Sequence, residues 1–291
     1  MANRPSLLTL GKLQAWVDTL PDEVVQDYGR LTFNVSAVIL KHFFGVEWVE
    51  ANVVQDEDNK QPPTFLRLEF CDSVARETKS FRLVDLAETL FNLQIVPGFY
   101  DKIEDMKTAD LEASMAEFDF ARFLYWHKVA FGFVKPSKVK GSDYDFKIRY
   151  PNGVIACADA KCRLEGTTIN PATIRNSLDD ARKRNLPADK PGMIFIKVPK
   201  TWLATADLQN QITAVVNAFL RGTGRIVAVT VYAPIVDILT DRPLIRTRHR
   251  FEEYANPKHR FDRDHDWLLF KNFKVPADQQ GAPNHWCRLF P

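Results

Sequence analysis

Residues 141–161 constrain the fold of this chain most strongly, because they combine two strand patterns with a turn between them. Over 143–150 polar and apolar residues alternate, which is typical of a strand with one buried face. Pro-Asn-Gly at 151–153 favours a tight turn. The mostly small and apolar run at 154–161 predicts a strand that is covered on both faces. We therefore expect a β-hairpin within a sheet that other elements enclose.

The predicted hairpin brings acidic residues and a lysine together. Asp159 and Lys161 are two positions apart on the second strand, so their side chains leave the same face. Antiparallel pairing can bring Asp143 or Asp145, at the start of the first strand, beside them. Neighbouring carboxylates repel each other unless a cation lies between them, and their oxygens suit Mg²⁺ or Mn²⁺. Because an adjacent lysine can orient an attacking water, the pattern indicates metal-dependent hydrolysis of phosphodiesters.

An acid followed by a strand, a turn, a strand and Asp-Ala-Lys resembles the active-site signature of the PD-(D/E)XK nuclease superfamily, which has the restriction-endonuclease-like fold. In this resemblance Asp143 or Asp145 stands for the first acid. Asp159 stands for the second acid, and Lys161 for the lysine that orients the nucleophile. The resemblance also implies Mg²⁺ or Mn²⁺ as the cofactor, with the carbonyl of Ala160 as a further ligand. The chain departs from the pattern in having no proline before the first acid.

The tripeptide at 159–161 gains its weight from its context. The pattern of an acid, any residue and a lysine also occurs at 58–60, 77–79, 105–107 and 145–147. What distinguishes 159–161 is that it ends an apolar strand that follows an acid-bearing strand. The alternative interpretation is a surface hairpin whose charges are solvated. Against it, an aspartate and a lysine at the end of so apolar a strand would be partly buried, and buried charges need partners.

Further candidate residues lie around the hairpin. Glu117, on the helix expected before it, is the position at which the resemblance implies an auxiliary metal ligand or a base. The basic residues expected to contact a phosphate backbone are Lys138, Lys140, Arg163, Arg175 and Arg182. The alternative for all of them is an ordinary solvated surface.

The remaining patterns predict two regions. Residues 1–106 are expected to form an α+β region for packing or partner binding, with helices at 6–20, 33–44 and 83–93 and strands at 46–54 and 64–70. Residues 107–291 are expected to form the nuclease domain with a C-terminal extension. Around the hairpin this domain has predicted helices at 108–133, 171–185 and 208–220 and strands at 191–198 and 225–232. The predicted fold class is α/β, a restriction-endonuclease-like mixed sheet flanked by helices, with the N-terminal α+β region added.

Composition predicts an ordinary globular protein of the reducing cytoplasm. The formal net charge is +2, so contact with nucleic acid must rest on a local basic patch. The four cysteines lack a framework spacing, no charged-then-apolar stretch with a cleavage site predicts a secretory leader, and no apolar run of about 18 residues predicts a membrane span. We therefore expect a cytoplasmic protein without a membrane partner. Its expected partner is nucleic acid, with DNA favoured over RNA, and a homodimer is left open.

These observations predict a Mg²⁺-dependent nuclease, a hydrolase of the endonuclease kind. One alternative is a non-catalytic nucleic-acid-binding or assembly protein that keeps the nuclease-like scaffold. Another is a small-molecule phosphohydrolase, which would turn over nucleotides without binding polymers. Incubation with polymers and nucleotides, in the presence of Mg²⁺, Mn²⁺ or EDTA, separates the three.

Overall fold

The computed structural model describes residues 5–53, 73–109, 111–137, 139–163, 167–168, 170–239 and 244–270, with the side chains of 73–80 and 234–249 left aside. The chain divides into two compact units. The first contains Met1–Ile95, Phe99–Leu111 and Lys274–Pro291, and the second contains Val96–Gly98 and Glu112–Phe273. Among the described residues, no helix is both long enough and apolar enough to span a lipid bilayer.

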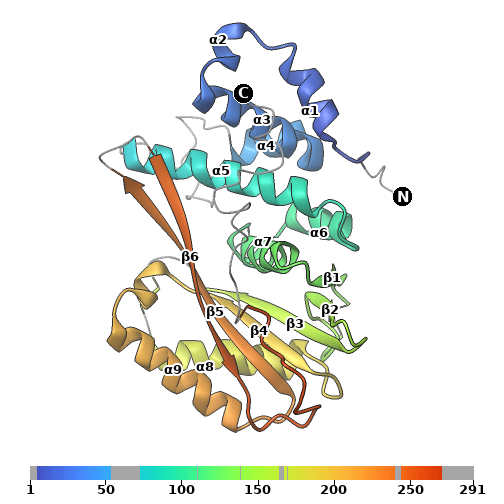
Figure 1. The fold of residues 1–291 in the computed structure, drawn as a ribbon, viewed down its shortest axis with the longest axis vertical. Coiled ribbons are helices and arrows are strands. Elements are labelled where there is room, and N and C mark those ends of the chain that lie inside the picture. Colours follow the sequence, from blue (N-terminus) through green and yellow to red (C-terminus); the bar gives the residue numbers. More distant parts are fainter. Residues whose placement is uncertain are drawn as a thin grey trace. The chain divides into compact units, whose positions relative to one another are not determined.

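Within the described residues, the first unit is built from helices alone (Figure 1). These are α1 (Leu10–Val17), α2 (Asp22–Val25), α3 (Tyr28–Phe44), α4 (Val46–Asn52), α5 (Ser73–Leu93) and α6 (Phe99–Met106). The side-chain oxygen of Thr9 accepts the N–H of Lys12 and so caps the start of α1. Leu31, Val35 and Ile39 of α3 lie four residues apart and are all buried. This spacing gives α3 the apolar stripe on which the unit packs.

The strand predicted at 46–54 is wrong, because this segment forms α4. Valine and tryptophan favour strands, but here Val49 and Val53 lie four residues apart and both are buried. The ring of Trp48 also stacks on Phe44, with the ring centroids 4.0 Å apart. Packing of a helical face has therefore overridden strand propensity, and the described part of this region is not α+β. The strand predicted at 64–70 lies outside the described residues.

The second unit contains a six-stranded mixed sheet, so the α/β class is confirmed. Its strands are β1 (Ala130–Phe133), β2 (Phe146–Arg149), β3 (Ile155–Cys162), β4 (Gly192–Lys197), β5 (Ile226–Leu239) and β6 (Leu244–Ala255), and they lie in this order across the sheet. β1, β2 and β3 are antiparallel neighbours, whereas β4 is parallel to both β3 and β5. β6 pairs antiparallel with β5 and forms one edge. The helices are α7 (Leu111–Trp126), α8 (Pro171–Asp180) and α9 (Ala206–Arg221), with the π-helical turn η1 (Ala181–Asn185) directly after α8 and the 3₁₀ turn η2 (Lys200–Leu203) before α9.

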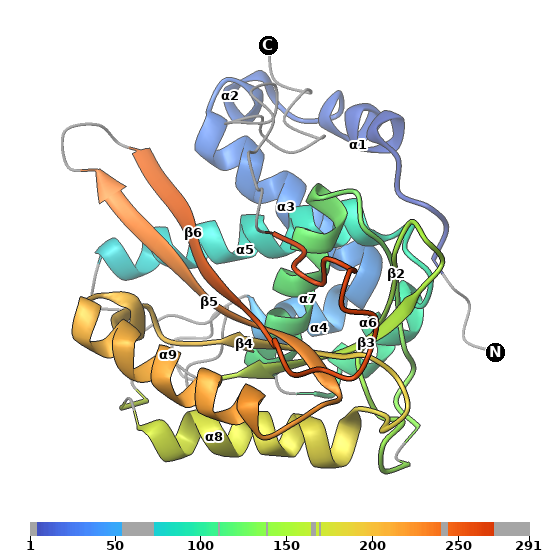
Figure 2. The ribbon, with the colours of Figure 1, turned by 60° about the horizontal axis from the view of Figure 1, so that its bottom comes forward.

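The sheet of the second unit lies between two helical layers (Figure 2). On one face, Phe120 of α7 stacks on Phe195 of β4, with the ring centroids 4.7 Å apart. On the other face, α8 and α9 enclose a core that contains Ile194 and Ile196 of β4. Every residue of β4 is buried, as expected for a strand that is covered on both sides. Because successive strand residues point to opposite faces, these contacts assign the neighbouring β3 residues to one layer or the other.

The helix predicted at 108–133 is shorter than expected, and its last residues belong to β1. α7 ends at Trp126, and two residues later Lys128 has a left-handed φ of +55°. Phe131 and Phe133 then face Phe146 of β2, at ring-centroid distances of 6.2 and 5.3 Å. The apolar run therefore continues past the end of α7 because it also supplies the first strand.

Candidate active site

β3 carries two of the predicted residues on one face of the sheet. In the parallel register Asp159 lies beside Ile194 and Lys161 beside Ile196, so all four side chains face the layer of α8 and α9. The side chain of Asp159 is 1% exposed and that of Lys161 is 22% exposed. The end of β3 therefore holds a fully buried carboxyl group next to a lysine that reaches solvent.

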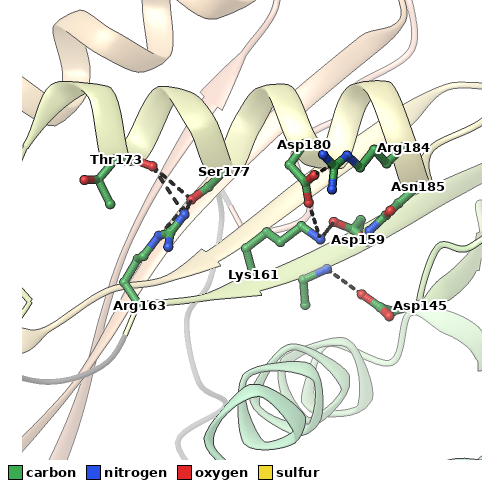
Figure 3. A network of polar contacts seen from close by, with 10 residues as sticks. Asp145, Asp159, Lys161, Arg163, Thr173, Ser177, Asp180, Arg184 and Asn185 are labelled. Carbon is green, nitrogen blue, oxygen red and sulfur yellow. Dashed lines mark hydrogen bonds and ion pairs between the residues drawn. The ribbon is translucent and has the colours of Figure 1, made fainter. Parts of the chain in front are cut away.

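Lys161 is held between two carboxyl groups (Figure 3). Its Nζ lies 3.1 Å from Oδ2 of Asp159 and 3.5 Å from Oδ2 of Asp180, the last residue of α8. On the other side of Asp180, Nε of Arg184 lies 3.0 Å from Oδ1. Asn185 donates through Nδ2 to Oδ1 of Asp159 at 2.7 Å. The end of α8 and the turn η1 therefore fix the position of both catalytic candidates on β3.

Asp145 reaches the same place from the neighbouring strand. β2 pairs with β3 so that Phe146 lies opposite Ala158, which places Asp145 one step further along, next to Asp159. Its Oδ2 accepts the N–H of Ala160 at 2.7 Å (Figure 3). In a strand the N–H and the carbonyl of one residue point to the same side, so the carbonyl of Ala160 also faces the Asp145 edge. Two carboxyl groups and this carbonyl are thus gathered around the start of β2 and the end of β3.

Asp143 takes a different position from Asp145. Its Oδ1 accepts the N–H of Ser137 at 2.7 Å, and its own N–H donates to the carbonyl of Asn185 at 3.2 Å. These bonds tie the segment before β2 to itself and to η1. The sequence left both Asp143 and Asp145 open as the first acid. In the structure it is the carboxylate of Asp145 that accepts from the backbone N–H between Asp159 and Lys161.

The electrostatics of the site reflect an excess of acidic groups. Burial raises the pKa of Asp159, the nearby charge of Asp145 raises it further, and the result is about 7 in spite of Lys161 and Asn185. Burial lowers the pKa of Lys161, but the carboxylates of Asp159, Asp145 and Asp180 outweigh it, so this pKa is raised. Near neutral pH the ammonium is therefore charged, whereas the charge of Asp159 is costly without a further cation.

The donor set fits a hard divalent cation with few protein ligands. Asp145 and Asp159 offer carboxylate oxygens and Ala160 a carbonyl oxygen, which are the ligand types that Mg²⁺ and Mn²⁺ prefer. No group of three or more His, Cys, Asp or Glu side chains suited to a metal occurs in the part of the chain that the structure describes. Mg²⁺ usually keeps several waters and takes only one or two protein carboxylates, so a smaller set is compatible with it.

Glu117 is not grouped with these residues. It is half-buried on α7, the helix whose Phe120 packs on the face of the sheet opposite to Asp159 and Lys161. Within the described residues it does not complete a three-carboxylate cluster with Asp145 and Asp159. Its auxiliary role stays a prediction of the resemblance.

The basic candidates have diverse surroundings. Lys140 is exposed in the turn before β2, and Lys138 lies outside the described residues. Arg163, just after β3, donates through Nε to Oγ of Ser177 at 2.9 Å and so ties this segment to α8 (Figure 3).

Arg175 and Arg182 lie where α8 meets α9. Both guanidinium groups stand over the ring of Phe219, at 5.3 and 5.5 Å from its centroid. Both also pair with Asp179, at 3.1 and 2.8 Å. These contacts give the two arginines a packing role, and binding of a phosphate backbone by them stays a prediction.

Two residues of the site, Asp180 and Asn185, were not predicted from the sequence. They occupy the last residue of α8 and the last residue of η1, where the helix passes over the end of β3. The sequence did contain a signal, since Asp180 and Arg184 are an i, i+4 pair of opposite charge at the end of an amphipathic helix. The contact of Asp180 with Lys161 and that of Asn185 with Asp159 depend on the crossover between β3 and β4, which the sequence does not specify.

Comparison of the chain with protein-family models, with curated proteins and with solved structures finds no match. Conclusions about function therefore depend on the residues and contacts of the site itself.

Proposed function

We propose that this protein is a divalent-metal-dependent nuclease that hydrolyses phosphodiester bonds in nucleic acid, with DNA as the favoured substrate. The observation that carries the proposal is the meeting of Asp145, Asp159 and Lys161 at the ends of two adjacent strands. A buried carboxyl group with a pKa of about 7 beside a second acid is a typical functional-site feature.

The topology of the second unit also supports a restriction-endonuclease-like fold. From α7 onward the chain runs through three antiparallel strands, a helix and a parallel strand, which is an α-β-β-β-α-β order. Asp145 precedes the second strand and Asp159 lies on the third, as the resemblance to the PD-(D/E)XK superfamily implies.

Each residue has a defined task in this proposal. Asp145, Asp159 and the carbonyl of Ala160 would hold the cation, which when bound supplies charge stabilisation and a more acidic water. Lys161, charged and partly exposed, orients the attacking water and offsets negative charge that develops on the phosphate. Asp180 fixes Nζ of Lys161, and Asn185 fixes the carboxyl plane of Asp159. Since these contacts hold the side chains in place before substrate arrives, little reorganisation is needed.

The test is a cleavage assay with linear, circular and single-stranded DNA and with RNA, in Mg²⁺, Mn²⁺ or EDTA. We expect cleavage with either metal and none in EDTA. Asp145→Asn should lower the rate by about 100-fold or more, because it removes a metal-binding charge. Asp143→Asn, a matched change two residues away that can still accept from Ser137, should retain most of the rate.

Two outcomes would contradict the proposal. Binding of nucleic acid without cleavage under any metal condition would favour a non-catalytic protein on the same scaffold. Turnover of nucleotides without cleavage or binding of polymers would favour a small-molecule phosphohydrolase.

A further inference from the structure

A basic pocket lies in the second unit, and we define it as the cavity lined by Arg182, Lys183, Arg225, Arg260 and the turn at 222–224. The pocket is open to solvent, and its volume is about 330 Å³, at the lower end of the range for small-ligand sites. All four charged residues that line it are cations.

The fold gathers these cations from three distant segments. Arg182 and Lys183 belong to η1, Arg225 lies just before β5, and Arg260 follows β6. Charges of the same sign that are brought together repel one another unless an anion lies between them. An anion bound in the pocket would therefore reduce the repulsion among these cations.

Carboxylates do little to neutralise the pocket. Asp179 lies 2.8 Å from Arg182 and 3.9 Å from Lys183, so one acid is shared between these cations. Neither Arg225 nor Arg260 forms an ion pair with any residue that the structure describes. Burial lowers the pKa of Arg225, and the charges of Arg182 and Arg260 lower it further.

The backbone of the turn does not oppose an anion. The carbonyl of Thr223 accepts from Nδ2 of the buried Asn256 at 2.7 Å. The carbonyl of Gly224 accepts the N–H of Arg260 at 2.8 Å. Both carbonyl oxygens already accept a hydrogen bond, so the turn is held in place. The donors also offset the partial negative charge of these oxygens, which would otherwise repel an anion.

We propose that the basic pocket binds a phosphate group, at a site separate from Asp145, Asp159 and Lys161. Guanidinium groups recognise phosphate through paired, charge-assisted hydrogen bonds, and the pocket offers three of them with one ammonium. The pocket and the candidate active site share η1, since Arg182 lines the first and Asn185 contacts Asp159 in the second. That the phosphate belongs to a nucleic-acid chain rests on the proposed function, whereas binding of phosphate itself does not.

The first test is a calorimetric titration of the full chain with inorganic phosphate, in EDTA and at constant ionic strength set with chloride. We expect wild type to bind phosphate, and Arg225→Gln and Arg260→Gln each to weaken binding by about 10-fold or more. Arg221→Gln, the same change at an exposed residue outside the pocket, should leave the affinity unchanged. Lys161→Ala should also bind phosphate normally, which separates the pocket from the active site.

Failure of the pocket would be recognised directly. Absence of phosphate binding by wild type, or equal affinities of wild type and both pocket variants, would overturn the proposal whether or not the protein is a nuclease. A loss of binding in Lys161→Ala alone would move the phosphate to the active site and overturn it as well.

The second test identifies the source of the phosphate by using an oligonucleotide with and without a 5′-phosphate, again in EDTA. Tighter binding of the phosphorylated form that Arg225→Gln abolishes would assign the pocket to the end of a nucleic-acid chain. An equal loss for both forms would assign it to a backbone phosphate. No effect of Arg225→Gln on either form would exclude nucleic acid as the source.

Discussion

Two buried ion clusters lie on opposite faces of the same sheet, at the ends of neighbouring parallel strands. On the α7 face, Nζ of Lys197 on β4 lies 2.9 Å from Oδ2 of Asp119, whose Oδ1 lies 2.9 Å from Arg122. On the α8 face, Nζ of Lys161 on β3 lies 3.1 Å from Asp159. Each cluster therefore pairs a buried aspartate with a strand lysine, yet their balance of charge differs.

At Asp119 each carboxylate oxygen has its own cation, and the three side chains are at most 10% exposed. Around Asp159 several carboxyl groups instead share one lysine. Lys161 pairs with Asp180 as well as with Asp159, and the charge of Asp145 also acts on it. A buried carboxylate whose two oxygens each meet a cation needs no ligand to offset its charge, whereas a cluster with surplus carboxylates is stabilised by a further cation. The position of a charged pair on the sheet is thus a weaker guide to function than the ratio of acids to cations around it.

The largest expected effect separates chemistry from stability. Lys161→Ala should lower cleavage by about 10³-fold while the protein stays folded, because under the proposed function it removes the group that orients the nucleophile. Lys197→Ala should instead cost about 3–5 kcal/mol of stability, since it leaves a buried carboxylate with one cation fewer. Cleavage rates normalised to folded protein, together with urea unfolding curves, measure both. Full cleavage by a folded Lys161→Ala variant would remove the distinction between the clusters.

The second prediction concerns the sign of a stability change. The folded pKa of Asp159 is about 7 against an ordinary value of 3.8, so the unfolded carboxyl loses its proton first and stability falls as pH rises from about 4 to about 7. Asp159→Asn mimics the protonated group and should stabilise the protein at pH 8, by up to about 4 kcal/mol for three pKa units. Asp119→Asn should destabilise it, since Arg122 and Lys197 each lose an ion pair.

Thermal unfolding of both variants between pH 4 and pH 8 is the measurement. The gain of Asp159→Asn should shrink as pH falls and be absent near pH 4, where the wild-type carboxyl is protonated in both states. Destabilisation by Asp159→Asn across the whole range would mean that the ion pair with Lys161 outweighs the cost of burying the charge of Asp159 and the repulsion by Asp145.

The third prediction adds the metal. If the dissociation constant is about 1 mM, 10 mM Mg²⁺ at pH 7.5 should stabilise the wild type by about 1.4 kcal/mol, or roughly 3 °C in Tm. Asp159→Asn should lose this shift, and the structural variant Asp119→Asn should keep it. Equal shifts in the two variants would indicate that Mg²⁺ binds elsewhere.

The sequence predicted the strands around the site because the alternation at 143–150 and the apolar run at 154–161 are local patterns. It could not choose between Asp143 and Asp145, because that choice depends on where β2 begins and on the bond from Ala160. It did not reveal Asp180 either, since the path of α8 over β3 is set by packing between distant segments. The error at 46–54 has a similar origin, because buried contacts of Val49 and Val53 decided between helix and strand.

The smallest expected effect tests how finely the site is adjusted. The hydrogen bond from Asn185 lowers the pKa of Asp159, so Asn185→Ala should move the acid limb of the pH–rate profile to higher pH, by up to about one unit. The rate well above this limb should change little, because the carboxylate is then fully ionised. Asn210→Ala, at an exposed position of α9, serves as the control and should leave the profile unchanged. A uniform loss of rate at all pH values would indicate that Asn185 positions the carboxyl group without changing its pKa. The geometry of the cluster at Asp159 would then matter more for cleavage than its balance of charge.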